Sequence, residues 1–151
     1  MTIKIETSVA INRPSEEVFA YVSNFENNPH WQSGMQEAKF TSEGPLRIGS
    51  TYAQVAKFLG RRIETNFEVI AYEPNRMVKA TSTSGSFPIT FTRIVEPGQD
   101  GGSQVSAIIE GDTSGFFSLA KPLMARLARR SIEADYANLK RIMENQVVDR
   151  A

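Results

Sequence analysis

The chain has 151 residues, 40% hydrophobic and 23% charged, which matches one globular domain across residues 1–151 with enough length to bury a core. Its 17 basic and 17 acidic side chains cancel, so no overall positive field favours binding to nucleic acid or to an anionic membrane. The chain has no cysteine, which excludes disulfides, thiolate catalysis and thiolate metal sites.

The first 31 residues predict one strand followed by two short helices. Residues 3–12 alternate apolar and polar side chains, the pattern of a strand with one face in water. Residues 13–17, Arg-Pro-Ser-Glu-Glu, are typical of a helix start. A proline there gives up an N–H that would lack a partner, and glutamates favour the positive end of the helix dipole. The Asn-Asn-Pro segment at 27–29 ends this helix and begins a short second one with His30 and Trp31.

The middle of the chain predicts six further strands joined by short turns. Gly60 and Gly85 each separate two strand-like stretches, and short connections of this kind favour antiparallel hairpins. The predicted strands are the stretch around Ala38 and Phe40 and residues 50–59, 61–72, 76–83, 86–95 and 104–112.

Residues 119–146 predict one long amphipathic helix, about 40 Å in length. Arg126, Arg129 and Arg130 of its outward half form a basic cluster with Lys121, which we expect to be a solvated face; contact with acidic headgroups or a partner is the alternative. Such a helix can lie across a whole curved sheet and leave a cavity beneath it. The inward half comprises Met124, Ala128, Ser131, Ile132, Asp135, Tyr136, Leu139, Ile142 and Met143.

Neither a targeting segment nor a membrane span is expected. Residues 1–12 lack the charged stretch and apolar run of a signal peptide, and nowhere do about 18 apolar residues follow one another. We therefore expect a cytoplasmic protein.

Four segments, together with the order of elements, resemble the START-like helix-grip superfamily (SRPBCC) in its polyketide cyclase/dehydrase group: residues 12–19, 27–31, 49–52 and 135–140. The resemblance covers residues 3–146. It implies an α+β fold in which a seven-stranded antiparallel sheet curves around a long C-terminal helix, with two short helices between strands 1 and 2 and a ligand cavity between sheet and helix. Members of the superfamily include lipid carriers, aromatase/cyclases, hormone receptors and chaperone-associated modules, so the fold does not fix the function.

The apolar strand faces are the candidate walls of that cavity. Along 61–72, the apolar side chains share one face and Glu64 and Glu68 share the other, so a paired-carboxylate mechanism loses its best candidates. The parity of 50–59 is ambiguous, because both of its faces carry apolar residues. Phe116, which follows Gly111 and Gly115, either caps the core or gates the cavity. The predicted ligand-binding residues are Trp31, Tyr52, Phe67, Val69, Phe91, Phe116, Leu127 and Ser131.

Four polar residues are the candidates for chemistry: Asp135, Arg93, Tyr52 and Tyr136. Asp135 lies at the centre of the apolar helix face, where an unpaired carboxylate is costly. We expect it to accept backbone N–H groups or to pair with a basic side chain; a general acid or base with a raised pKa is the alternative. Arg93 ends an apolar strand face, where we expect a structural ion pair or a snorkelling side chain, with a ligand anion as the alternative.

No cofactor or metal is expected. The sequence has no Gly-x-Gly-x-x-Gly, P-loop or Gly-x-Ser-x-Gly motif. His30 is the only histidine, and without cysteine it cannot build a zinc site.

These patterns favour binding or transport of a small hydrophobic ligand, such as a lipid, an aromatic or a polyketide-like compound. One alternative is an aromatase/cyclase or dehydratase acting on a polyketide-like substrate. The other is a protein-interaction module with a collapsed cavity. We expect no nucleic-acid partner and no transmembrane segment, and the sequence leaves a homodimer open.

Overall fold

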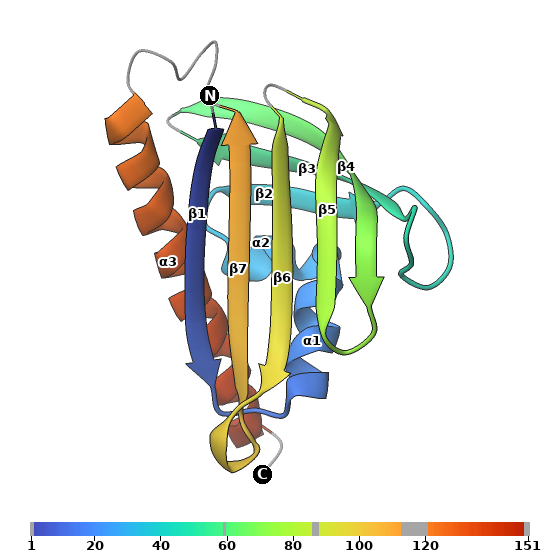
Figure 1. Ribbon diagram of the computed structural model, residues 1–151, viewed down its shortest axis with the longest axis vertical. Coiled ribbons are helices and arrows are strands. Elements are labelled where there is room, and N and C mark those ends of the chain that lie inside the picture. The colour runs from blue at the N-terminus through green and yellow to red at the C-terminus, as the bar shows by residue number, and fades with distance from the viewer. Residues whose placement is uncertain (1, 59, 86–87, 113–120, 150–151) are drawn as a thin grey trace.

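The seven strands form one antiparallel sheet in the order β1-β7-β6-β5-β4-β3-β2 (Figure 1). This is a computed structural model that describes residues 2–58, 60–85, 88–112 and 121–149. The strands are β1 (Thr2–Ile11), β2 (Met35–Phe40), β3 (Thr51–Phe58), β4 (Arg61–Glu73), β5 (Met77–Ser84), β6 (Ile89–Pro97) and β7 (Ser103–Asp112). Every predicted strand is confirmed, with ends that shift by a few residues.

The helices are α1 (Ser15–Ser23), η1 (Phe25–Asn27), α2 (Asn28–Trp31), η2 (Gln99–Gly101) and α3 (Lys121–Asp149). The two short helices α1 and α2 follow β1 as predicted, and both lie behind the sheet in Figure 1. The strands β2 and β3 run across the direction of β1, β7 and β6, so the sheet curls around this side. Two register shifts in the β4–β5 pairing add to the local twist and bend.

α3 runs alongside β1, and its last turns pass behind β1 and β7 (Figure 1). It packs on β1 and α2, whereas α1 packs on β6 and α2 on β2. The sheet curves around the C-terminal helix as expected, and α1 and α2 share its inner face with α3. The predicted helix face is confirmed: Asp135, Tyr136, Leu139 and Met143 are buried.

The charged side of α3 covers the outer edge of β1. Lys140 Nζ donates to the carbonyl oxygen of Ala10 at 2.6 Å, and Arg129 Nη1 donates to that of Glu6 at 3.4 Å. Glu144 accepts from the backbone N–H of Asn12 at 2.9 Å. These contacts pair backbone groups of an edge strand that would otherwise be open to another chain. Arg129 is thus not a simply solvated side chain.

The interior changes character along the strands. At the end nearer the C-terminus, large apolar side chains are at most 2% exposed; this closed half is defined by Ile11, Val95, Val105, Leu139 and Met143. At the other end, several inward-facing residues are only half-buried, although Ile5 among them is 3% exposed; this open half is defined by Ile3, Ile89, Ile109, Leu127 and Ser131. The same strands and the same helix therefore enclose a packed region and a less filled one.

No helix within the described residues is long and apolar enough to cross a membrane.

Candidate functional site

Arg93 lies at the boundary between the two halves and is buried, with 3% of its surface exposed. Its Nη1 donates to the carbonyl oxygen of Val22 at 2.8 Å and to Asn28 Oδ1 at 3.1 Å, and its Nε donates to the Tyr136 hydroxyl at 3.2 Å. These acceptors belong to α1, α2 and α3. One guanidinium therefore ties three helices to β6.

Aromatic rings surround this guanidinium. Its Cζ lies 4.8 Å from the ring centre of Phe91, 4.9 Å from that of Trp31 and 5.6 Å from that of Phe25, within the range of cation–π attraction. Trp31 also meets Tyr136 edge-on at 4.9 Å. A cation is thus held in an apolar setting by ring faces and neutral oxygens.

The expected ion pair or snorkelling position is wrong for Arg93. The side chain does not reach the surface, and none of the ion pairs of the described residues includes it. Its alternation with Phe91 and Val95 places it on the inner face of β6, where its hydrogen-bond partners lie on three helices.

Tyr52 lies on the inner face of β3, which resolves the ambiguous parity of that strand. It is 1% exposed, pairs with Phe67 across β3 and β4 and stacks on it with ring centres 5.0 Å apart. It also stacks on Phe25 at 4.4 Å. Burial raises the pKa of Tyr52 far above its usual value, although the charge of Arg93 acts in the opposite direction. The side chain is therefore a neutral phenol.

Two buried donors of this cluster have no hydrogen-bond partner within the described residues: the Tyr52 hydroxyl and Trp31 Nε1. Buried polar atoms are nearly always paired, and each exception needs an explanation. Arg13 Nε and Gln32 Oε1 are also without partners, but neither residue makes a ring contact with the cluster. Two of these four unpaired atoms therefore belong to the aromatic cluster around Arg93.

Asp135 has a structural partner, as the sequence predicted. Its Oδ1 accepts from the backbone N–H and from the hydroxyl of Ser33, both at 2.9 Å. Burial raises the pKa of Asp135, while the two Ser33 bonds and the charge of Arg93 lower it by less. Ser33 was missed because it lies 102 residues away in a loop after α2, and no local pattern points to it.

The predicted ligand-binding residues lie in two places, the aromatic cluster at the boundary and the open half. Trp31, Tyr52, Phe67, Val69 and Phe91 are buried around the aromatic cluster. Leu127 and Ser131 are half-buried on α3. Phe116 and the proposed gate lie outside the described residues. Of the chemistry candidates, Arg93 and Tyr136 touch each other, Tyr52 lies in the same cluster, and Asp135 bonds to Ser33.

The inner face of the open half carries small residues. Gly111 pairs with Ile3 on β1 and with Ile89 on β6, so its missing side chain would point toward the helix side of the sheet. Among the described residues, a Cβ placed there would meet only the carbonyl oxygen of Pro88, at an ordinary 3.6 Å. As far as the described residues go, this part of the inner face therefore has room for another group.

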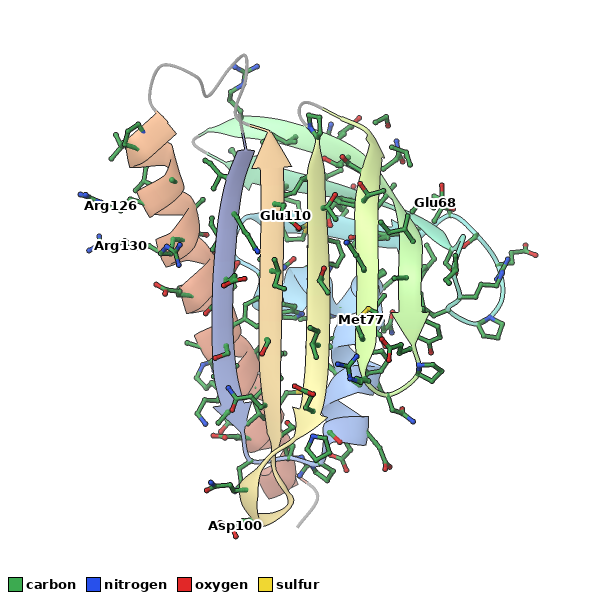
Figure 2. All side chains as sticks on the ribbon, viewed as in Figure 1. Glu68, Met77, Asp100, Glu110, Arg126 and Arg130 are labelled. Carbon is green, nitrogen blue, oxygen red and sulfur yellow. The ribbon has the colours of Figure 1, made fainter. Side chains whose placement is uncertain are left out.

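The outer faces show no such arrangement. Glu64 and Glu68 lie on the outer face of β4, as predicted. Arg126 and Arg130 are exposed and point away from the sheet (Figure 2). A groove beside the β1 edge is lined largely by polar residues, including Glu6, Ser8, Ser106 and Glu133. Within the described part of the chain, no three His, Asp or Glu side chains are placed to hold a metal ion.

The curved sheet, the C-terminal helix and the aromatic interior together define this protein as a helix-grip domain of the START type. The family described as "Polyketide cyclase / dehydrase and lipid transport" matches residues 2–144. The chain therefore belongs to this family.

Solved structures agree in fold. The Zhui aromatase/cyclase from Streptomyces sp. R1128 is similar with a TM-score of 0.80 at 12% identity, over 97% of this chain and 96% of that one. TTHA0849 from Thermus thermophilus follows with 0.78 at 15% identity, over 92% and 95%. A START superfamily protein from Mycobacterium smegmatis gives 0.75 at 15% identity, over 98% and 99%. No curated protein sequence matches the chain significantly.

Proposed function

We propose that the chain acts as one domain that binds or carries a small hydrophobic molecule between the open half of the sheet and the first half of α3. The difference in packing between the two halves carries this proposal. Apolar side chains that face inward and yet remain half-buried, such as Ile89 and Ile109, gain stability when a ligand covers them, by about 25 cal/mol per Å². The ligand would be a lipid, an aromatic or a polyketide-like compound.

The walls of this region fit such a ligand. Apolar residues of β1, β6 and β7 face α3, whose side chains Leu127 and Ser131 are half-buried opposite them. The aromatic cluster closes the inner end of the region with a few polar atoms. A mostly apolar pocket with few convergent polar groups is the usual form of a small-molecule site.

Native mass spectrometry of the freshly purified chain tests this proposal. A carrier should retain, or take up from a mixed library of lipids and aromatic compounds, a non-covalent ligand of discrete mass. The same ligand should raise the melting temperature. A clean apo mass together with no thermal shift across the library would reject the proposal.

A filling substitution locates the site. Gly111→Val adds a side chain toward α3 where the structure has room, so we expect a native melting temperature and a loss of ligand uptake. Ser106→Val adds the same side chain on the outer face of the same strand and should leave uptake unchanged. Equal uptake by both variants would place the ligand elsewhere.

The contact of Arg93 with Tyr136, in one cluster with Tyr52, favours an aromatase/cyclase or dehydratase as the second candidate. Such an enzyme needs buried donors for a developing oxyanion. Incubation with a linear poly-β-ketone, followed by ultraviolet absorbance, would reveal an aromatic product. Tyr52→Phe and Tyr136→Phe should then slow its formation; an unchanged spectrum with the unmodified protein would exclude this activity.

The interaction-module alternative has less support. It predicts a broad exposed apolar patch. Among the described residues, the exposed large hydrophobics are Ile48, Ile70 and Leu123, which lie in a loop, on β4 and at the start of α3.

A further inference from the structure

We propose that the Tyr52 hydroxyl donates a hydrogen bond to an anionic oxygen of the ligand, so that the molecule bound is an apolar compound with an ionised carboxylate. This inference rests on the proposed function and adds the chemistry of the ligand's polar end. Its basis is the set of buried polar groups around Arg93.

The set has more hydrogen-bond donors than acceptors. A guanidinium and an indole N–H can only donate, and the Tyr136 oxygen already accepts from Arg93. No carboxylate of the described residues forms an ion pair with Arg93. Asp135, the acid whose charge Arg93 stabilises, has its Oδ1 bound by Ser33. Within the described residues the two unpaired donors therefore lack an acceptor, and a negatively charged oxygen of the ligand would meet both a free donor and the positive field of Arg93.

Tyr52 is the donor best placed to meet it. Its ring and the Arg93 guanidinium pack on the same Phe25 ring, at 4.4 and 5.6 Å from its centre. Arg93 already donates to three neutral acceptors. It therefore acts on a ligand mainly through its positive charge and less through a further hydrogen bond. The Tyr52 hydroxyl has no partner in the described structure and can donate inside that field.

An unpaired hydroxyl in a packed aromatic cluster has a cost in the free protein. Folding removes it from water and returns no hydrogen bond. Phenylalanine would fill the same space without this cost. A tyrosine at position 52 is explained if its hydroxyl forms its hydrogen bond only when the ligand is bound.

The test compares matched probes at pH 7.5, where a carboxylic acid is ionised. Dodecanoate and methyl dodecanoate form one pair, and 2-naphthoate and methyl 2-naphthoate form a second with an aromatic body. Isothermal titration calorimetry gives the affinities. Trp31, the only tryptophan of the chain, lies 4.9 Å from the Arg93 guanidinium, so its fluorescence reports binding of the aliphatic pair at the site.

We expect at least one acid to bind about tenfold or more tighter than its ester, as for a hydrogen bond to a charged group. Tyr52→Phe should abolish this preference while it changes ester affinity by less than about threefold. Tyr72→Phe makes the same change at a half-buried tyrosine that stacks on Phe19 and should preserve the preference. The melting temperature of free Tyr52→Phe should equal or exceed that of the unmodified protein.

The outcomes separate the two proposals. Equal binding of acid and ester, or a preference that survives in Tyr52→Phe, overturns this inference and leaves hydrophobic binding intact. No binding of any of the four probes overturns this inference, and hydrophobic binding is rejected as well only if the native mass is also that of the apo protein and the library gives no thermal shift. A lower melting temperature of free Tyr52→Phe would show that the hydroxyl has a partner without ligand, which also overturns the inference.

Discussion

The closed and open halves of the interior are built from the same strands and the same helix, yet they differ in packing. In the closed half, Val95, Val105 and Leu139 are fully buried and Met143 is 2% exposed. In the open half, Ile89 and Ile109 continue the same alternating pattern and are only half-buried. A continuous hydrophobic pattern therefore does not imply a continuous core.

The difference follows from what each half packs against. Toward the closed end, α1 and α2 add Val18, Val22 and Trp31 to the inner face, all at most 1% exposed. Toward the open end, the inner face of the sheet carries Gly111, and among the described helices it lies nearest the first half of α3. Stability is thus concentrated at one end, which leaves the other end free to bind.

The largest expected effect is at Arg93, on the boundary. Arg93→Met keeps much of the volume but leaves the acceptors of Val22, Asn28 and Tyr136 without their donor, so we expect a loss of about 3–5 kcal/mol in the free energy of unfolding. Chemical denaturation measures it. Arg76→Met removes an exposed arginine that pairs with Glu73 and should cost under about 1 kcal/mol. Similar losses in both variants would mean that Arg93 does not join the helices.

The comparison itself is tested by one change made twice on α3. Leu139→Ala in the closed half, where the side chain is fully buried, should cost about 3 kcal/mol. Leu127→Ala in the open half, where it is half-buried, should cost about 1 kcal/mol. Urea denaturation of both variants gives the values. If the two losses were equal, the packing difference between the halves would be disproved.

Asp135 gives a pH dependence with a defined sign. Burial raises its pKa in the folded protein, so the folded state holds this proton more tightly than the unfolded chain does. The stabilising contribution is complete below the ordinary aspartate pKa and is lost as the pH rises through the raised value. The Asp135→Asn variant does not titrate at this position, so it does not lose stability in this way as the pH rises. Its stability relative to the unmodified protein should therefore increase with pH above about 3.8; a relative stability that falls with pH would contradict this.

The smallest expected effect is at the β1 edge. Lys140→Met removes the bonds to the Ala10 carbonyl oxygen and to Glu144. Because the side chain is 42% exposed, we expect a loss of about 1 kcal/mol or less. Thermal denaturation beside Lys39→Met, an exposed lysine of β2, provides the measure. A loss of stability as large as that of Leu139→Ala would mean that the contacts at the β1 edge stabilise the protein as much as the buried core of the closed half does.

Most of the fold could be predicted from local patterns, because each strand and helix carries its own periodicity. The inward position of Arg93 followed from its alternation with Phe91, but its partners did not, since Val22, Asn28 and Tyr136 lie on three other elements. Ser33 was unpredictable for the same reason. The Tyr52 hydroxyl is unpaired because no acceptor among the described residues lies within hydrogen-bond distance of it. No sequence pattern indicates such a missing acceptor.

The most direct test of the central claim is a methyl NMR titration with dodecanoate or 2-naphthoate. Binding in the open half predicts large shift changes at Ile3, Ile89, Ile109 and Leu127. The methyl groups of Val95, Val105 and Leu139 in the closed half should change little. Shifts concentrated in the closed half, or spread evenly over both halves, would contradict the account.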